Sequence, residues 1–132
     1  MTGNTSCKIG IFCEVNPSEE KAKIESAILN IFSDLQISIG EHQIKGKSNN
    51  INTLSKVSQS IHKKNTKNVY QRILQKNTNE NSTWFYLNKQ AAFTNIITLC
   101  DEEDQSPLGP IKVVLHSKNI EDVIDWLVSD VE

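Results

Sequence analysis

The sequence predicts an α+β protein: a two-layer sandwich in which helices cover one face of a mostly antiparallel or mixed sheet. Short apolar runs of strand length alternate with segments whose apolar residues recur at helical spacing. The predicted strands come in groups of two and three, with helices between the groups, which favours antiparallel pairing. At 132 residues the chain is long enough for one domain with a sizeable core. We therefore expect a single domain over residues 1–132, with residues 1–6 as a flexible N-terminus.

The chain opens with a half-buried strand over residues 7–15, because its side chains alternate. One face carries Cys7, Ile9, Ile11, Cys13 and Val15. The other face carries Lys8, Gly10, Phe12 and Glu14. A strand with this pattern packs its apolar face on a core and leaves the second face outside.

A helix is predicted next, with Ser18 as its N-cap and two glutamates in its first turn. Its apolar stripe consists of Ile24, Ala27, Ile28 and Ile31. Residues 35–39 and 43–48 then read as two strands joined by a turn. The chain therefore begins with a β-α-β-β order.

Two helical segments are predicted in the middle of the chain, over residues 51–61 and about 67–76. The second either continues the first with a kink or follows a turn. After a polar loop, three apolar runs of strand length follow at residues 84–87, 96–100 and 111–115, and we expect them to be neighbours in the sheet. Residues 120–127 form the last predicted helix, with Asn119 as its cap and acidic residues in its first turn.

Composition indicates a cytoplasmic protein. No apolar stretch approaches the roughly 18 residues that a membrane span requires, and the first residues lack the features of a signal peptide. The three cysteines, Cys7, Cys13 and Cys100, show no metal-type spacing and are interpreted as small buried residues in a reducing compartment.

Charge is distributed unevenly along the chain, although the overall net charge is only −2. Residues 41–90 contain eight lysines and one arginine against two acids, a net of +7, whereas residues 91–132 have a net of −7. A basic face that binds a polyanion would explain this asymmetry. The alternative is that the middle and the end of the chain neutralise each other in the fold.

Asn88, Lys89 and Gln90 form the first candidate contact site for a polyanion such as a nucleic acid. In one interpretation Lys89 pairs with a phosphate while the two amides donate to phosphate, sugar or a base edge. In the other, the amides satisfy backbone groups at strand ends and Lys89 is solvated.

Further candidate contacts with a nucleic acid lie in the basic middle of the chain and among the aromatic residues. The cations are Lys45, Lys47, Lys63, Lys64, Lys67 and Arg72. Tyr86 is a candidate for stacking on bases. Trp84 lies in an apolar run and is expected in the core instead.

Catalysis is not expected. The three histidines are scattered, and no phosphate-binding glycine loop or His/Cys ligand set occurs. The acidic run at residues 101–104 lacks the spacing of a calcium loop and is interpreted as solvated surface. The sequence thus predicts no metal and no cofactor.

Three motifs at residues 87–93 (Leu-Asn-Lys-Gln-Ala-Ala-Phe), 106–111 (Ser-Pro-Leu-Gly-Pro-Ile) and 124–127 (Ile-Asp-Trp-Leu) occur in order. With them, and with the opening segments 14–19 and 27–32, nearly the whole chain resembles an archaeal family of small proteins known as predicted RNA-binding proteins or predicted exosome subunits. The resemblance implies an α+β fold like that of ribosomal protein L5, which binds the small rRNA of the large subunit. It carries over no catalytic residue.

Two positions depart from the family pattern. Residues 63–69 hold lysines where the family has an arginine-rich segment, so forked donors are replaced by point charges. Asn95 stands where glycine is expected, although asparagine tolerates unusual backbone dihedrals better than most residues.

The residues and the resemblance together predict a non-catalytic RNA-binding module that contacts phosphates through a basic face. Protein subunits of an RNA-processing or degradation assembly are its candidate protein partners. The alternative is a protein-interaction subunit that docks on a larger assembly through its acidic C-terminal part. The two differ in whether partners stay bound after nuclease treatment.

Overall fold

Six antiparallel strands form one open sheet, and five α-helices accompany it in the part of the chain that the computed structural model describes, residues 6–100 and 108–129. The strands are β1 (Lys8–Glu14), β2 (Gln36–Ile39), β3 (Gln43–Ser48), β4 (Ser82–Leu87), β5 (Leu99–Cys100) and β6 (Ile111–His116). The helices are α1 (Lys21–Ile31), α2 (Ser55–Lys63), α3 (Lys67–Lys76), α4 (Lys89–Ala92) and α5 (Ile120–Val128), with a 3-10 turn, η1 (Ile51–Leu54), before α2. The predicted α+β class is confirmed.

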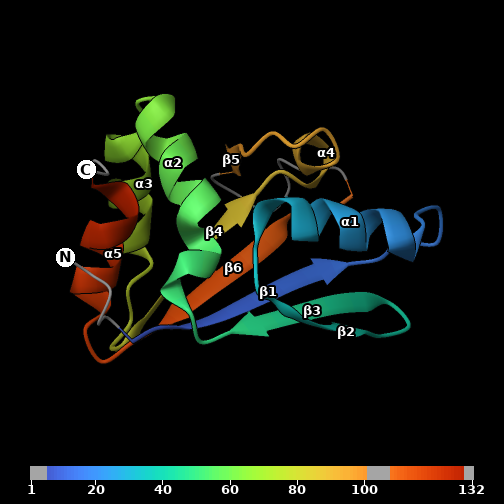
Figure 1. Ribbon diagram of the computed structural model, residues 1–132, viewed down its shortest axis with the longest axis horizontal. Helices are drawn as coiled ribbons and strands as arrows, with labels where there is room; N and C mark the ends of the chain where they lie inside the picture. The colour runs from blue at the N-terminus through green and yellow to red at the C-terminus, as the bar shows by residue number, and fades with distance from the viewer. Residues whose placement is uncertain (1–5, 101–107, 130–132) are drawn as a thin grey trace.

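The strand order is β2-β3-β1-β6-β4-β5, so the first strand of the chain lies inside the sheet between β3 and β6. The last three strands are neighbours, as their spacing predicts. Every pairing is antiparallel. Figure 1 shows the strands running side by side, with β2 and β3 along the lower edge of the view.

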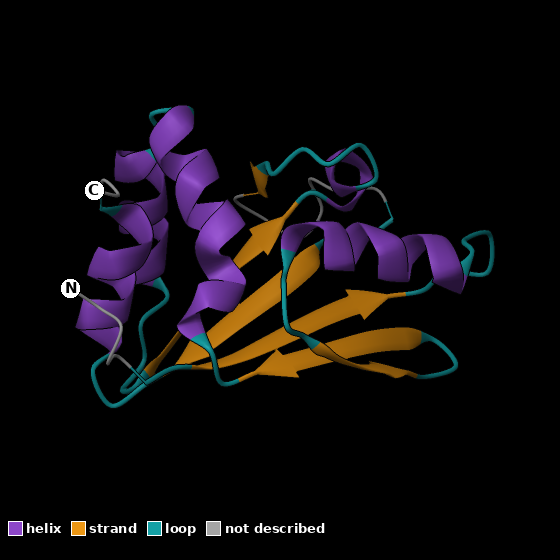
Figure 2. Cartoon of the chain, viewed as in Figure 1, coloured by secondary structure: helices purple, strands orange, loops and turns teal. Residues whose placement is uncertain are grey.

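The core lies between one face of the sheet and the helices, which are grouped on one side of the strands (Figure 2). The predicted apolar face of β1 and the predicted stripe of α1 are both buried in it. Phe85 of β4 packs edge-on against Tyr70 of α3, with ring centroids 5.8 Å apart. Trp126 is partly buried against the same core. None of the described helices combines the length and apolar character needed to cross a membrane.

The described cysteines are small core residues, as the sequence predicts. Cys7, Cys13 and Cys100 are buried and form no disulfide. Burial raises the pKa of the Cys7 and Cys13 thiols to about 11, so both are neutral at physiological pH.

Helix boundaries differ from the prediction at α1, which begins at Lys21 rather than just after Ser18. Glu20 occupies the N-cap position, and no acidic residue lies in the first turn. The reason is a turn before the helix, in which the Glu19 backbone N–H donates to the Asn16 carbonyl (2.9 Å). At α5, Asn119 occupies the predicted cap position, but its side chain makes no capping hydrogen bond. Instead, its backbone N–H donates to Ser117 Oγ (3.1 Å).

Three other expectations depend on the loops around β5. Within the described residues this strand comprises Leu99–Cys100, and the short helix α4 lies where no helix is expected. Asn95 has a φ of +63°, so asparagine does occupy a left-handed position there. Gly109 also has a positive φ (+88°), as a turn glycine should. The acidic run at 101–104 and residues 106 and 107 of the motif at 106–111 lie outside the described residues, as do residues 1–5 of the predicted flexible N-terminus.

Candidate nucleic-acid interface

One face of the sheet is turned away from the described helices, and its side chains form what we term the open sheet face. Strand residues alternate between the two faces, and the core takes the buried set. The opposite set is partly or fully exposed. It consists of Lys8, Gly10, Phe12, Glu14, Gln36, Ser38, Gln43, Lys45, Lys47, Ser82, Trp84, Tyr86, Lys112, Val114 and His116.

Cationic side chains outnumber acidic ones on this face. Its strand positions include four lysines, Lys8, Lys45, Lys47 and Lys112, and one carboxylate, Glu14. Lys45 and Lys47 come from the basic middle of the chain, whereas Lys8 and Lys112 come from segments whose net charge is negative. The fold therefore assembles a positive surface from three separate strands.

Strand register places lysines and aromatic rings next to one another. Phe12 lies directly opposite Lys45 on β3 and opposite Lys112 on β6. Lys112 is in turn opposite Tyr86 on β4. Directly opposed side chains on one face have Cβ atoms about 4.5–5.5 Å apart, which is contact distance for long side chains. The row Lys45–Phe12–Lys112–Tyr86 thus crosses four adjacent strands.

The aromatic residues of β4 form a pair on this face. The Trp84 and Tyr86 ring centroids are 5.0 Å apart, and the Lys112 ammonium nitrogen lies 5.1 Å from the Trp84 centroid. That distance is typical of a cation–π interaction. The core placement expected for Trp84 is therefore wrong: the buried residues of β4 are Thr83, Phe85 and Leu87, and strand alternation turns Trp84 outward.

A shallow hollow of about 170 Å³ lies on the open sheet face beside Phe12. Its side-chain lining includes Phe12, Glu14, Gln43, Tyr86 and Lys112. Since a water molecule takes about 30 Å³ of liquid, the hollow has room for several waters or part of a planar ring. Aromatic, cationic and amide groups therefore meet at one concave place.

Lys89 is not part of this surface, and the structure contradicts its expected role as an exposed phosphate contact. Its side chain is fully buried. The ammonium nitrogen donates to the backbone carbonyls of Glu14 (2.8 Å) and Leu108 (2.7 Å) and forms an ion pair with Glu19 Oε1 (3.0 Å). These three partners occupy the donors of an ammonium group, so Lys89 has none to offer an RNA phosphate.

Asn16 completes the cluster around Lys89. Its side-chain amide donates to Glu19 Oε1 (2.9 Å) and to the Leu108 carbonyl (2.8 Å). Burial alone would raise the pKa of Glu19, but hydrogen bonds from the Asn16 backbone and side chain and from the Lys89 ammonium outweigh it and lower the pKa. Glu19 is therefore an anion that the fold holds in place.

Acid should weaken the fold through Glu19. Because its folded-state pKa lies below the ordinary value of 4.5, its ionised form stabilises the protein fully above that value. This contribution is lost as the pH falls from about 4.5 through the lowered pKa. We expect the free energy of urea unfolding of the Glu19→Gln variant to depend less on pH below about 4.5 than that of wild type. The exposed neighbour Glu20 supplies the control, Glu20→Gln, and equal pH dependence in wild type and Glu19→Gln would contradict the assignment.

The two amides beside Lys89 have different surroundings. Asn88 caps α4, and its side-chain oxygen accepts from the Ala91 N–H (2.9 Å). The backbone N–H of Asn88 donates to the Thr98 carbonyl (2.8 Å). These contacts agree with the second interpretation of the segment, in which amides satisfy backbone groups. Gln90 is exposed.

The remaining predicted cations form a separate group on the helices. Lys63, Lys64, Lys67 and Arg72 are exposed on α2, α3 and the turn between them. The Lys64 ammonium donates to the Ile97 carbonyl (2.7 Å). Since these helices pack on the covered side of the sheet, the helical cations do not share one surface with Lys45 and Lys47 of β3.

Sequence reasoning missed Lys8, Phe12, Trp84 and Lys112 as candidate contacts. The signal that identifies Phe12 and Lys8 is present in the sequence, because alternation along residues 7–15 puts them on the face opposite the core. The same rule applies to Lys112 in residues 111–115 and to Trp84 in residues 84–87. Only their proximity across strands requires the sheet order.

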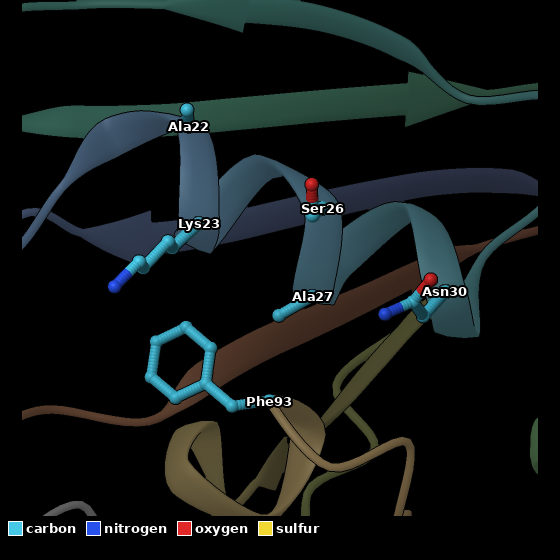
Figure 3. A pocket seen from close by; sticks show the side chains of 6 residues that line it. All are labelled: Ala22, Lys23, Ser26, Ala27, Asn30 and Phe93. Atoms are coloured by element: carbon cyan, nitrogen blue, oxygen red, sulfur yellow. The ribbon is translucent and has the colours of Figure 1, made fainter.

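A second hollow lies on the helical side, between α1 and the residue that follows α4. It measures about 640 Å³ and is lined by Ala22, Lys23, Ser26, Ala27, Asn30 and Phe93. Figure 3 shows the Phe93 ring turned toward α1. The Lys23 ammonium lies 3.4 Å from Glu20 Oε1, so its charge is already partnered. This hollow has fewer groups suited to phosphate or base recognition than the open sheet face.

The fold and its surface define a class of protein: an α+β domain with helices on one side of an antiparallel sheet and cations and aromatic rings on the other. A family model described as RNA binding matches residues 8–117. The chain belongs to this family, the archaeal UPF0201 family.

Relatives cover almost all of the chain. A UPF0201 protein of Methanothermobacter thermautotrophicus is 35% identical over 94% of this chain and 92% of its own length. One from Sulfurisphaera tokodaii is 35% identical over 91% of this chain and 86% of its own length. The crystal structure of the UPF0201 protein from Methanococcus jannaschii matches with a TM-score of 0.79 at 25% identity, covering 95% of each chain.

Proposed function

We propose that this protein binds RNA through the open sheet face and acts as a binding module rather than as an enzyme. The observation that carries the proposal is the four lysines that share this face with one carboxylate. The description of the family model supports RNA as the polyanion. Cations attract phosphates, and aromatic rings stack on bases. Side chains of both kinds serve to bind a nucleic acid and not to cleave its bonds.

Phosphate contacts on this face would come from Lys45, Lys47 and Lys112, with Lys8 at the border. Each contacted phosphate releases counterions, which lowers the slope of log affinity against log salt by about 0.7 for single strands. Four contacts predict a slope of about −3. The lysine side chains are long enough to reach phosphates while rings on the same face contact bases.

Charge removal tests the proposal. We expect the triple variant Lys45→Gln/Lys47→Gln/Lys112→Gln to bind a labelled RNA more weakly and to reduce the salt slope by about 2, measured by fluorescence anisotropy between about 50 and about 200 mM salt. The matched control, Lys63→Gln/Lys64→Gln/Lys67→Gln, changes the same charge on the helices. RNA recovered at full length from the complex would agree with binding without catalysis.

The control also tests the helical cations. The salt dependence of RNA affinity could fall in the triple variant at Lys63, Lys64 and Lys67 and stay unchanged in the triple variant at Lys45, Lys47 and Lys112. RNA would then bind to α2 and α3 instead of the open sheet face. No binding of wild type to any RNA would reject the proposed function.

A protein-interaction role is the alternative, and the exposed side chains Glu121, Asp122 and Asp125 on α5 favour it. An acidic surface repels RNA and attracts a basic partner. Capture of partners from native extract distinguishes the two, because partners held through RNA leave after nuclease treatment. Association with an exosome or another RNA-processing assembly, and a fold relationship to ribosomal protein L5, stay predictions.

A further inference from the structure

Aromatic rings and cations lie close together on the open sheet face. We propose that the face binds single-stranded RNA, with unpaired bases stacked on Phe12 and on the Trp84–Tyr86 pair and with phosphates on Lys45, Lys47 and Lys112. This inference rests on the RNA binding proposed above and adds the class of ligand.

Spacing across the sheet is the first argument. Phe12 on β1 and the aromatic pair on β4 are separated by β6 alone. Two inter-strand spacings of about 4.8 Å put the rings roughly 10 Å apart. Lys112 stands between them in register with Phe12 and Tyr86, and Lys45 stands on the other side of Phe12. Rings and cations therefore alternate across the sheet. A nucleic-acid strand likewise offers one base and one phosphate in each nucleotide.

The position of the Phe12 ring is the second argument. A Cβ atom built on Gly10 would lie 3.1 Å from Phe12 Cε2, so the ring lies over the glycine, two residues earlier on the same strand. A larger side chain at position 10 would press on the ring. Glycine thus lets Phe12 lie along the sheet, beside the hollow of about 170 Å³ that Lys112, Gln43 and Tyr86 also line.

Stacking on a protein ring requires a base with an uncovered face. In a double helix the bases are stacked on each other, and proteins recognise duplex RNA by its shape and through phosphates and 2′-hydroxyls. Aromatic side chains on a sheet instead stack with splayed single-stranded bases. Because every base has a π-face, the site should tolerate many sequences.

Paired substitutions of two phenylalanines test the inference. Phe12 lies on the open sheet face, whereas Phe93, 40% exposed, lies on the helical side. We expect Phe12→Ala to weaken binding of a fluorescein-labelled single-stranded oligonucleotide by about 5- to 150-fold, while Phe93→Ala leaves it unchanged. Phe12→Leu keeps an apolar side chain in the strand but removes the π-face, and it should lose affinity as well. Circular dichroism confirms that each variant is folded.

Tryptophan fluorescence supplies a second measurement. The chain has two tryptophans, Trp84 and Trp126, so the Trp126→Phe variant reports on Trp84 alone. We expect single-stranded RNA to quench the Trp84 emission. The duplex formed by the same strand and its complement should bind more weakly and quench the emission less.

The outcomes separate the inference from the proposed function. Equal affinity for single-stranded and duplex RNA, or equal binding by the folded Phe12→Leu and Phe93→Leu variants, would overturn base stacking while RNA binding stands. Failure of wild type to bind either form would overturn both.

Discussion

Replacing Lys89 with methionine is expected to lower the free energy of unfolding by about 3–5 kcal/mol. The substitution leaves the Glu19 carboxylate buried without its cation and removes the donor to the Glu14 and Leu108 carbonyls. Breaking one side of a buried ion pair costs far more than the pair contributes, because the remaining charge is uncompensated. Urea unfolding followed by circular dichroism measures the change.

Two further variants make this result specific. Lys21→Met alters an exposed lysine on α1 and should change stability by no more than about 0.5 kcal/mol. Lys89→Met/Glu19→Leu removes both charges and should recover part of the loss. A loss below about 1 kcal/mol for Lys89→Met would show that the cluster is not a buried ion pair. RNA affinity of the folded Lys89→Met variant should equal that of wild type, since the side chain does not reach the open sheet face.

Adjacent aromatic residues on β4 should respond to substitution in opposite ways. Phe85 is fully buried and packs on Tyr70, so Phe85→Ala should destabilise the protein by about 3–5 kcal/mol. Trp84 points to the other face, so Trp84→Ala should have a much smaller effect on stability and a large effect on RNA affinity. Urea unfolding and RNA anisotropy of both variants test the contrast. Destabilisation by Trp84→Ala as large as that by Phe85→Ala would mean that Trp84 belongs to the core.

Much of the fold is predictable because strand and helix periodicities are strong in this chain. The alternation along residues 7–15 places every described side chain of β1 on its correct face, and α3 begins and ends where its pattern predicts. These elements depend on local spacing alone. The helix α4 escapes prediction because four residues are too few to show a period.

Lys89 could not be placed from the sequence because its partners lie far away along the chain. Glu14 and Glu19 precede it by 75 and 70 residues. A lysine flanked by two amides has the composition of a surface segment, and only the meeting of β1, α4 and the Leu108 region encloses it.

The candidate interface was predictable in part. The excess of lysine at residues 41–90 identifies Lys45 and Lys47, but charge counted along the chain merges cations from both layers of the fold. Lys63 on a helix and Lys47 on a strand are both lysines of the same basic segment. They differ only in the layer of the fold to which they belong. The contributions of Lys8 and Lys112 depend on sheet order, which brings β1 and β6 together from opposite ends of the chain.

The central place of β1 has a consequence for how the protein is made. Strand β1 precedes its partner β6, residues 111–116, by most of the length of the domain, so one of its edges stays without its native neighbour until β6 has been synthesised. An unpaired edge can join other chains, and pairings between distant segments form slowly. The centre of the sheet therefore forms only after residues 111–116 are available, and until then the free edge of β1 is a site where other chains could pair.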